Sequence, residues 1–460
     1  MTTIFKSWVG RQGAALALAA TVVTLIPAWW SDASAGKFKV LHSFCSGGSC
    51  GDGSQPQGAL VIDSVGNFFG TTESGGHDFD GTVFELSPTD AGKLKFNRIF
   101  SFCSRTDCLG GAHPQGALIV DNAGNLYGTA TDLGQGNGGV VFKLTRGSKR
   151  WNETVLYSFC HQSGCSDGAR PAAGLTYAGA ASGVPYDGES PLYGTTASGG
   201  ANNAGTAFKL SQSGGQWIES VLHDFCSEGG AACTDGKLPL AALLVDQAGN
   251  LYGATVYGGS DNIENGGGTV FELSSVGGVW THKVLYRFCS LSHCKDGYGP
   301  LAALTMDSAG SLLGTTAAGG RTCSQHSEGC GVVFKLVPDG DGWQESVLYA
   351  FCRKPDCSDG SAPAGSVLLD SFGNLFGTTQ NGGGFDIDFH SLGGGVVFEF
   401  TSSSLNILHR FCSSPECSDG AQPSAGLALD ADGTLYGTTQ FGGSVNDPSS
   451  GGTVYKVVAP

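Results

Sequence analysis

Beyond its first 35 residues, the sequence has no stretch in which apolar side chains recur with the 3.6-residue period of an amphipathic helix. It also has no second apolar run long enough to cross a bilayer. Basic residues are few, since 24 lysines and arginines stand against 40 aspartates and glutamates and give a formal net charge of −16. That balance argues against binding to nucleic acid or to an anionic membrane surface. The sequence motifs of serine hydrolases, zinc metalloproteases and phosphate-binding loops are absent as well.

One pattern with a period near 60 residues occurs seven times along the chain. A clear copy contains Leu240 to Asp246, then Asn250 to Thr255, then Gly268 to Leu273, and finally Val284 to Cys289. Such a period is typical of stacked supersecondary units. Each of the four segments predicts a strand of 5 to 8 residues, because it is rich in β-branched and aromatic residues and is bounded by Gly, Asp, Asn or Ser.

Seven units of this kind predict an all-β fold, namely a seven-bladed β-propeller with four antiparallel strands per blade. The N-terminal segment Phe38 to Phe44 matches a fourth strand of the repeat, whereas the final segment Gly452 to Val458 matches a third strand. We therefore expect the N-terminal strand to complete the last blade, which closes the ring and leaves no open sheet edge. A linear β-solenoid is the alternative.

The 16 cysteines form eight pairs that are close in sequence. Seven pairs recur once per copy at intervals of 57 to 66 residues, and the eighth lies within one loop of one copy. The expected disulfides are Cys45–Cys50, Cys103–Cys108, Cys160–Cys165, Cys226–Cys233, Cys289–Cys294, Cys323–Cys330, Cys352–Cys357 and Cys412–Cys417. Zinc is the competing use of paired cysteines, but a structural zinc site needs two pairs close together in space.

The N-terminus has the features of a signal peptide over residues 1–35. Lys6 and Arg11 supply positive charge, Ala14 to Trp30 is mostly apolar, and residues 33–35 are small, as a cleavage site requires. We expect residues 36–460 to form a single propeller domain that is secreted or periplasmic and has no membrane span. An uncleaved membrane anchor is the alternative.

The core Gly-Asn-Leu-Tyr-Gly-Thr-Thr-x-x-Gly-Gly, followed by Gly-Thr-Val-Phe-Lys-Leu, recurs in order in the seven copies. Mild departures are Leu312-Leu313 and Pro191. This core resembles the GloVer tandem repeat of bacterial exported proteins, which implies a secreted or surface protein of undefined activity. The phrase Pro-x-x-Leu-x-x-Asp-x-x-Gly-Asn-Leu-Tyr is also similar to NHL-type propeller repeats. That second resemblance implies that the first strand of each copy lines the central channel.

The loop after each fourth strand, here called the cysteine loop, carries the cysteine pair and, in six copies, an aspartate. These loop aspartates are Asp52, Asp167, Asp235, Asp296, Asp359 and Asp419. The second copy has Leu109-Gly110-Gly111 instead. The blade phase puts the cysteine loops on one face with the variable loops between second and third strands, and the aspartates near the channel mouth. They are either turn residues that bond nearby backbone or a ligand-binding ring that attracts a cation or a hydroxyl-rich molecule.

Two variable loops carry acidic clusters, His77 to Asp80 and Asp386 to His390. We expect solvated loop charge there, with a structural calcium ion as the alternative, because neither cluster has the spacing of an EF-hand. No metal site or cofactor is predicted. The ten histidines do not recur at one repeat position, so no catalytic residue stands out.

The expected function is therefore that of a secreted, disulfide-bonded, monomeric binding module for an extracellular polysaccharide or a cell-surface protein. An extracellular hydrolase or lyase that uses carboxylates on the cysteine-loop face is one alternative. A structural protein of the envelope or matrix is another. The third copy carries an insertion, Ala178 to Ser190, to which the sequence assigns no role.

Overall fold

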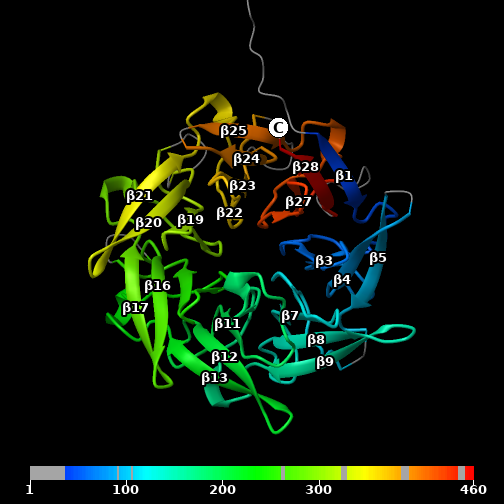
Figure 1. Ribbon diagram of the computed structural model, residues 1–460, viewed down its shortest axis with the longest axis horizontal. Coiled ribbons are helices and arrows are strands. Elements are labelled where there is room, and N and C mark those ends of the chain that lie inside the picture. Colours follow the sequence, from blue (N-terminus) through cyan, green and yellow to red (C-terminus); the bar gives the residue numbers. More distant parts are fainter. Residues whose placement is uncertain are drawn as a thin grey trace, which may run out of the picture. The chain divides into compact units, whose positions relative to one another are not determined.

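The computed structural model describes residues 37–459 except 91–92, 105–106, 261–264, 323–328, 385–392, 403 and 444–450. The described residues form seven four-stranded antiparallel sheets arranged in a ring (Figure 1). No helix among them is long and apolar enough to span a bilayer. The predicted signal peptide and the acidic cluster Asp386 to His390 lie outside the described residues.

The strands of each blade follow one another from the channel outward. Blade 1 consists of β2 (Val61–Ile62), β3 (Phe68–Thr72), β4 (Thr82–Pro88) and β5 (Leu94–Ser101), and blade 2 of β6 (Ile119–Val120), β7 (Leu126–Ala130), β8 (Val140–Arg146) and β9 (Trp151–Ser158). Blade 3 consists of β10 (Thr176–Tyr177), β11 (Leu192–Thr196), β12 (Thr206–Ser213) and β13 (Gln216–Asp224), and blade 4 of β14 (Leu244–Val245), β15 (Leu251–Thr255), β16 (Thr269–Val276) and β17 (Val279–Arg287). Blade 5 consists of β18 (Thr305–Met306), β19 (Leu312–Thr316), β20 (Val332–Asp339) and β21 (Gly342–Ala350), and blade 6 of β22 (Leu368–Leu369), β23 (Leu375–Thr379), β24 (Val396–Phe400) and β25 (Leu405–Arg410). Blade 7 consists of β26 (Ala428–Leu429), β27 (Thr434–Thr439), β28 (Thr453–Val458) and β1 (Phe38–Ser43).

The ring is closed by the N-terminal strand, as predicted. β1 pairs antiparallel with β28, from Phe38 opposite Val457 to Ser43 opposite Thr453. Figure 1 shows the two strands side by side at opposite ends of the colour scale. The outermost strand of blade 7 therefore comes from the other end of the chain from its three partners.

The innermost strands are shorter than predicted, at two residues each. The reason is crowding at the channel axis, where the segment before each inner strand contacts the next blade. A Cβ added to Gly116 would lie 2.7 Å from the carbonyl carbon of Ala173 in the neighbouring blade. The carbonyl of Gly116 itself accepts a 3.2 Å hydrogen bond from Thr71 Oγ1 of the preceding blade. These residues therefore hold neighbouring blades together instead of extending the sheet.

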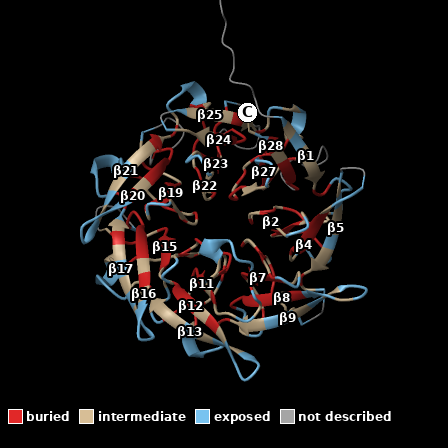
Figure 2. Ribbon diagram, viewed as in Figure 1, coloured by how far each residue is buried: buried red, intermediate tan, exposed pale blue. Residues whose placement is uncertain are grey.

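The core of each blade lies around the second and third strands, which are buried in Figure 2, whereas the outer strands are largely intermediate or exposed. A glycine in the second strand makes room for the aromatic side chain opposite it. A Cβ on Gly70 would lie 2.5 Å from Cζ of Phe84, which is fully buried. A neighbouring side chain therefore approaches these glycines closely.

The tryptophans that begin the outer strands are packing residues. The ring of Trp280 lies 6.0 Å from that of Tyr193 in the second strand of the preceding blade, in an edge-to-face arrangement. Trp151 and Trp343 meet Phe69 and Tyr252 in the same way, at 6.2 and 6.4 Å. Aromatic pairs of this geometry stabilise beyond their buried area, so they contribute to the contact between blades.

Seven of the expected disulfides are present, one per cysteine loop. Both cysteines of each bond adopt φ between 44° and 62°, a region that non-glycine residues rarely occupy. Five loops contain a short 3-10 helix: η1 (Ser163–Cys165), η3 (Gly230–Ala232), η4 (Ser292–Cys294), η5 (Pro355–Cys357) and η6 (Pro415–Cys417). Cys323 lies outside the described residues, so its bond to Cys330 stays a prediction.

The cysteine loops share one face with the loops between second and third strands, as expected. In every blade a glycine of the second-to-third-strand loop donates its N–H to the carbonyl of the second cysteine, for example Gly76 to Cys50 at 2.9 Å. The Asp-x-x-Gly-Asn hairpins lie at the other ends of the strands, and in the first of them Asp63 N–H bonds Asn67 O at 3.0 Å.

Removal of residues 37–44 tests the closure. It uncovers the hydrogen-bonding edge of β28 and deletes Phe44, which is fully buried. Loss of one such aromatic costs about 3–5 kcal/mol, so we expect a fall in melting temperature of about 5 °C or more. Removal of residues 459–460, beyond β28, is the control and should change it far less. Equal melting temperatures for wild type and the 37–44 deletion would contradict closure by β1.

Candidate functional site

The loop aspartates do not lie in one cluster; each is held within its own cysteine loop. Asp359 Oδ2 accepts hydrogen bonds from Tyr349 Oη (2.6 Å) and the Arg353 amide (2.9 Å), while Oδ1 accepts from the Lys354 amide (3.1 Å). The other five follow the same plan, with a tyrosine or histidine of the outer strand and loop amides as partners. Five of the six are at most 5% exposed, and Asp52 is the partial exception.

The loops lie over the second and third strands of the following blade rather than beside the innermost strands. A Cβ on Gly53, next to Asp52, would lie 2.5 Å from Oγ1 of Thr72 and 2.7 Å from Oγ1 of Thr82. The hydrogen bonds of the carboxylates run to the loop itself and to the preceding outer strand. These are the contacts of turn residues, and binding of a ligand by the loop aspartates stays a prediction.

One outer-strand position pairs with the loop aspartate in the six copies that have one, and the residue type at this position follows the presence of the carboxylate. The residues at this position are His42, Phe100, Tyr157, His223, Tyr286, Tyr349 and His409. The expectation that the histidines do not recur at one repeat position is therefore wrong for three of them. Phe100, the one member that cannot donate a hydrogen bond, precedes the one loop that has Gly110 in place of the aspartate. This correspondence is visible in the sequence, and it supports a structural role for the pair.

Opposing effects set the pKa values of the histidine-paired aspartates. Burial alone would raise the pKa of Asp235, but hydrogen bonds from His223 and from the hydroxyl and amide of Ser227 outweigh it and lower the pKa to about 2. The same balance, with burial opposed first by His42 or His409, lowers the pKa values of Asp52 and Asp419. These carboxylates are therefore ionised acceptors of charge-assisted hydrogen bonds.

Each pair of a loop aspartate and its tyrosine or histidine is covered by a residue from the outer strand of the next blade. His282 stacks on His223 with ring centroids 3.9 Å apart, and burial followed by the nearby His223 lowers the pKa of His282 to about 3. Glu219 and Glu345 occupy the same position in blades 3 and 5. Burial, followed by repulsion from Asp167, raises the pKa of Glu219 to about 8, and burial with repulsion from Asp296 raises that of Glu345 to about 7.

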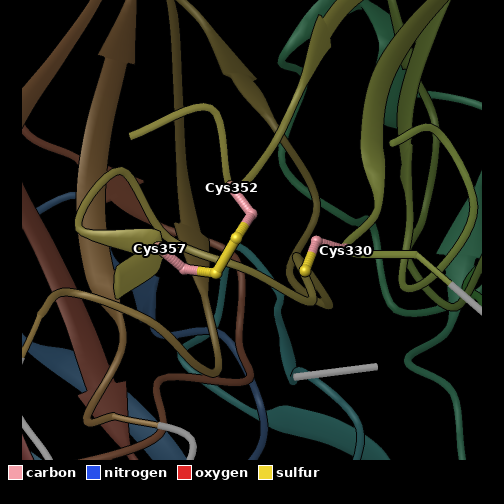
Figure 3. Close-up of side chains that lie close together, drawn as sticks. All are labelled: Cys330, Cys352 and Cys357. Atoms are coloured by element: carbon pink, nitrogen blue, oxygen red, sulfur yellow. A yellow bond between two sulfur atoms is a disulfide. The ribbon is translucent and has the colours of Figure 1, made fainter. Parts of the chain in front are cut away.

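The described residues contain one triple of neighbouring sulfur atoms, those of Cys330, Cys352 and Cys357. Figure 3 shows the bond between Cys352 and Cys357, with the side chain of Cys330 beside it. Disulfide sulfurs lack the thiolate charge that binds zinc. None of the described cysteines is free, so the disulfide interpretation is confirmed over zinc for the seven pairs.

A cavity of about 710 Å³ lies on the channel at the face opposite the cysteine loops. It is bounded by the inner strands β2, β6 and β10 with the turns that follow the first two, Asp63–Val65 and Asp121–Gly124, and by Ala180, Gly183 and Pro185 of the insertion. Its walls combine apolar side chains such as Leu118 and Leu175 with the polar groups of Asn122 and Thr176. A concave, mainly apolar surface with a few convergent polar groups is typical of a ligand site.

The insertion of the third copy, residues 178–190, is a built part of this cavity. Tyr186 is fully buried, packs edge-to-face on Tyr127 at 5.0 Å, and its carbonyl accepts a 3.1 Å bond from the Asn122 amide. Tyr127 in turn donates to Asp121 at 3.0 Å, and burial together with Asp121 raises the pKa of Tyr127. The short helix η2 (Ala180–Ser182) contacts β14 of blade 4, so the insertion reaches from blade 2 to blade 4 on the inner side of the ring (Figure 1).

The insertion is visible in the sequence, but its position in the channel is not. The signal that could have found it is its apolar content, Val184, Pro185 and Tyr186, at a place where the other six copies have a polar turn of a few residues. Apolar residues at a turn predict packing against another part of the protein. Here Tyr186 packs on the neighbouring blade, whereas Val184 and Pro185 are exposed.

A double-mutant cycle tests the structural role of the aspartate pairs. Asp359→Ala leaves the Tyr349 hydroxyl and two amides without an acceptor and should cost about 2–4 kcal/mol, whereas Tyr349→Phe should cost about 1 kcal/mol. We expect the double variant to cost about 1 kcal/mol less than the sum, measured by denaturant unfolding. Asp359→Ala with Tyr436→Phe, in another blade, is the additive control. Additivity in both cycles would contradict the coupling.

The raised pKa values of Glu219 and Glu345 predict a loss of stability at high pH. A group whose pKa is raised on folding contributes its full stabilisation below the unfolded pKa, and loses it as pH rises through the folded value. Here that loss falls between about pH 4.5 and pH 8. The Glu219→Gln/Glu345→Gln variant should melt at a higher temperature than wild type above pH 8, with a flatter pH profile. Glu228→Gln/Glu416→Gln, at exposed positions, should keep the wild-type profile. Parallel profiles of melting temperature against pH for wild type and both variants would contradict the role of Glu219 and Glu345.

Two solved structures and one family model are similar to this chain. A protein from Bacteroides uniformis, described as a candidate 6-phosphogluconolactonase, is 12% identical, has a TM-score of 0.45, and covers 77% of this chain and 84% of its own. A protein from Lactobacillus plantarum is 13% identical, with a TM-score of 0.44 and coverage of 78% and 84%. No curated protein matches the chain. The model of the Gloeobacter/Verrucomicrobia repeat matches residues 30–190, 180–324 and 320–459. Because these three consecutive stretches cover almost the whole chain, the protein belongs to the Gloeobacter/Verrucomicrobia repeat family.

Proposed function

We propose that this protein is an extracellular binding module that holds a glycan segment in the channel cavity beneath the 178–190 insertion. The observation that carries the proposal is the cavity itself, since it forms where one copy departs from the sevenfold pattern. Six copies connect first and second strands by a short turn, whereas the third supplies a packed segment that walls the opening.

The chemistry of the lining suits a sugar. Apolar side chains of three inner strands offer a surface for the C–H faces of a pyranose, and Tyr177 adds an aromatic ring. Around them, Asn122 and Thr176 present polar groups within the same cavity, which fits the small number of directional contacts that orient a ligand. The wall and the polar groups come from separate blades, so a rigid ring positions them.

Export is part of the proposal. Seven disulfides indicate an oxidising compartment, and the sequence of residues 1–35 has the charge, apolar run and small residues of a signal peptide. A monomeric exported propeller with a carbohydrate site would meet polysaccharide or the sugars of a cell surface.

A glycan array followed by titration calorimetry tests the proposal. In the key variant, residues 178–191 are replaced by Asp-Ser-Val-Gly-Asn, the turn of the first copy at 63–67. The pairing of Tyr177 with Leu192 matches that of Ile62 with Phe68, so the blade should still form. We expect the affinity for the best glycan to fall about tenfold or more.

The matched control is Gln247→Ser/Ala248→Val, which writes the same turn into blade 4 away from the cavity lining. It should bind as wild type does. Equal binding by both variants would overturn the cavity as the site, and an array without hits would overturn the glycan as the ligand. Turnover of a bound glycan would replace the binding module with an enzyme.

A further inference from the structure

The turn that joins the first and second strands of blade 6 exposes an aromatic side chain. Phe372 in this turn is 88% exposed. A side chain so exposed contributes little to the burial of apolar surface, so packing of the blade does not account for it. The turn connects β22 to β23, and Figure 1 shows β22 beside the central channel.

This turn has the same geometry as the turns that bound the channel cavity. The Phe372 amide donates a hydrogen bond to Asp370 Oδ1 at 2.9 Å, as the Val65 amide does to Asp63 Oδ1 at 3.0 Å. The Ala123 amide makes the same bond within its own turn, at 2.9 Å. Val65 and Ala123 both belong to the wall of the cavity. Because the blades repeat around one channel, Phe372 lies at the same mouth of that channel.

The residue type at this turn position differs between copies. The six copies that have the turn carry Val65, Ala123, Ala248, Ala309, Phe372 and Asp432. One of the six is aromatic, and three copies have alanine in its place. The phenyl ring is therefore a property of blade 6 and not a requirement of the turn.

Blade 7 lies between this turn and the cavity. Its second strand packs on blade 6, where Leu435 and Phe376 share one apolar cluster, and on blade 1, where the rings of Tyr436 and Phe68 are 4.4 Å apart. The turn of blade 7 carries Asp432, which is exposed and can accept hydrogen bonds from hydroxyl groups. Neighbouring blades thus present the cavity, a carboxylate and an aromatic ring in succession.

The charge at this mouth of the channel is negative. The first residue of each of the six turns is an aspartate: Asp63, Asp121, Asp246, Asp307, Asp370 and Asp430. Asp432 adds a seventh carboxylate, whereas Lys335 pairs with one of the seven, Asp307, at 2.8 Å. A field of this sign repels a chain that carries carboxylate or sulfate groups.

We propose that this mouth of the channel binds a non-acidic oligosaccharide of several sugars, with one sugar in the cavity and a later one stacked on Phe372. The face of a phenyl ring attracts the C–H groups of a pyranose, and Asp432 accepts hydrogen bonds from hydroxyls between the two. Binding at the cavity raises the effective concentration of the same chain at Phe372, so a chain that reaches both binds more tightly. This inference rests on the function proposed above and adds the length and charge class of the glycan.

The test is calorimetric titration of cello-, malto- and laminari-oligosaccharides, each as disaccharide and hexasaccharide, with hexagalacturonate as the acidic chain. We expect at least one neutral hexasaccharide to bind wild type more tightly than its disaccharide and more tightly than hexagalacturonate. The key variant is Phe372→Ala, which introduces the alanine of blades 2, 4 and 5 and should preserve the turn. It should weaken binding of that hexasaccharide about threefold to tenfold and leave binding of the disaccharide unchanged. Phe372→Tyr keeps the ring and should bind both as wild type does.

Phe79→Ala is the matched control, since it removes a phenyl ring that is 63% exposed from the cysteine-loop face. It should bind the hexasaccharide as wild type does. Replacement of residues 178–191 tests the cavity through loss of disaccharide binding, whereas Phe372→Ala tests the second subsite through the hexasaccharide, so failure of one is distinguishable from failure of the other. The inference is overturned if no neutral hexasaccharide binds, if each binds no more tightly than its disaccharide or hexagalacturonate, if Phe372→Ala binds as wild type, or if Phe79→Ala weakens binding equally.

Discussion

The pairing of β1 with β28 is the interaction on which the ring depends. Six blades are built from consecutive strands and could stack without it, but the seventh would end in the unpaired backbone of β28. Closing that edge fixes the number of blades and forces each sheet to meet two neighbours. It also fixes the phase of the repeat, which sets the cysteine loops on one face and the Asp-x-x-Gly-Asn hairpins on the other.

Much of this arrangement follows from the sequence, because a repeat states the same physical requirement seven times. The glycine of the second strand, such as Gly70, and the aromatic residue opposite it recur together since each needs the other's shape. The strand of the repeat with which the ring begins can be read from the sequence, because Phe38 to Phe44 matches a fourth strand that has no third strand before it. Closure was therefore predictable from the order of segments alone.

The length of the inner strands and the surroundings of the loop aspartates were not predictable in the same way. The first depends on contacts between blades, and the second on how each cysteine loop folds back on its own outer strand. Gly116 meets Ala173 of the next blade at the crowded axis, and Asp359 bonds Tyr349 of the strand that precedes its loop. Single-sequence patterns report a residue's own strand, whereas these partners come together only when blades and loops have folded. The exchange of Tyr or His for Phe100 beside Gly110 is the kind of paired change that does disclose such a contact.

Symmetry gives the molecule a uniform background on which departures stand out. The insertion that walls the channel lies where one copy differs from the other six. Residues that satisfy the repeat are accounted for by packing, hydrogen bonding or backbone geometry. The binding chemistry proposed for the protein resides in the positions that the repeat leaves unexplained, on a scaffold stiff enough to hold them in place.

The placement of the disulfides also bears on how the chain can be oxidised. Sixteen cysteines allow a very large number of pairings, yet each partner in the seven bonds is only five or seven residues away. Loop closure over so few residues is fast, so each bond can form as its own segment becomes accessible, without waiting for the ring. The exception is the region of Cys330, whose sulfur lies within 4.8 Å of both sulfurs of the Cys352–Cys357 bond. Among the described residues, blade 5 is therefore where the sulfur atoms of two expected bonds lie side by side, so the pairing there depends on which bond forms first.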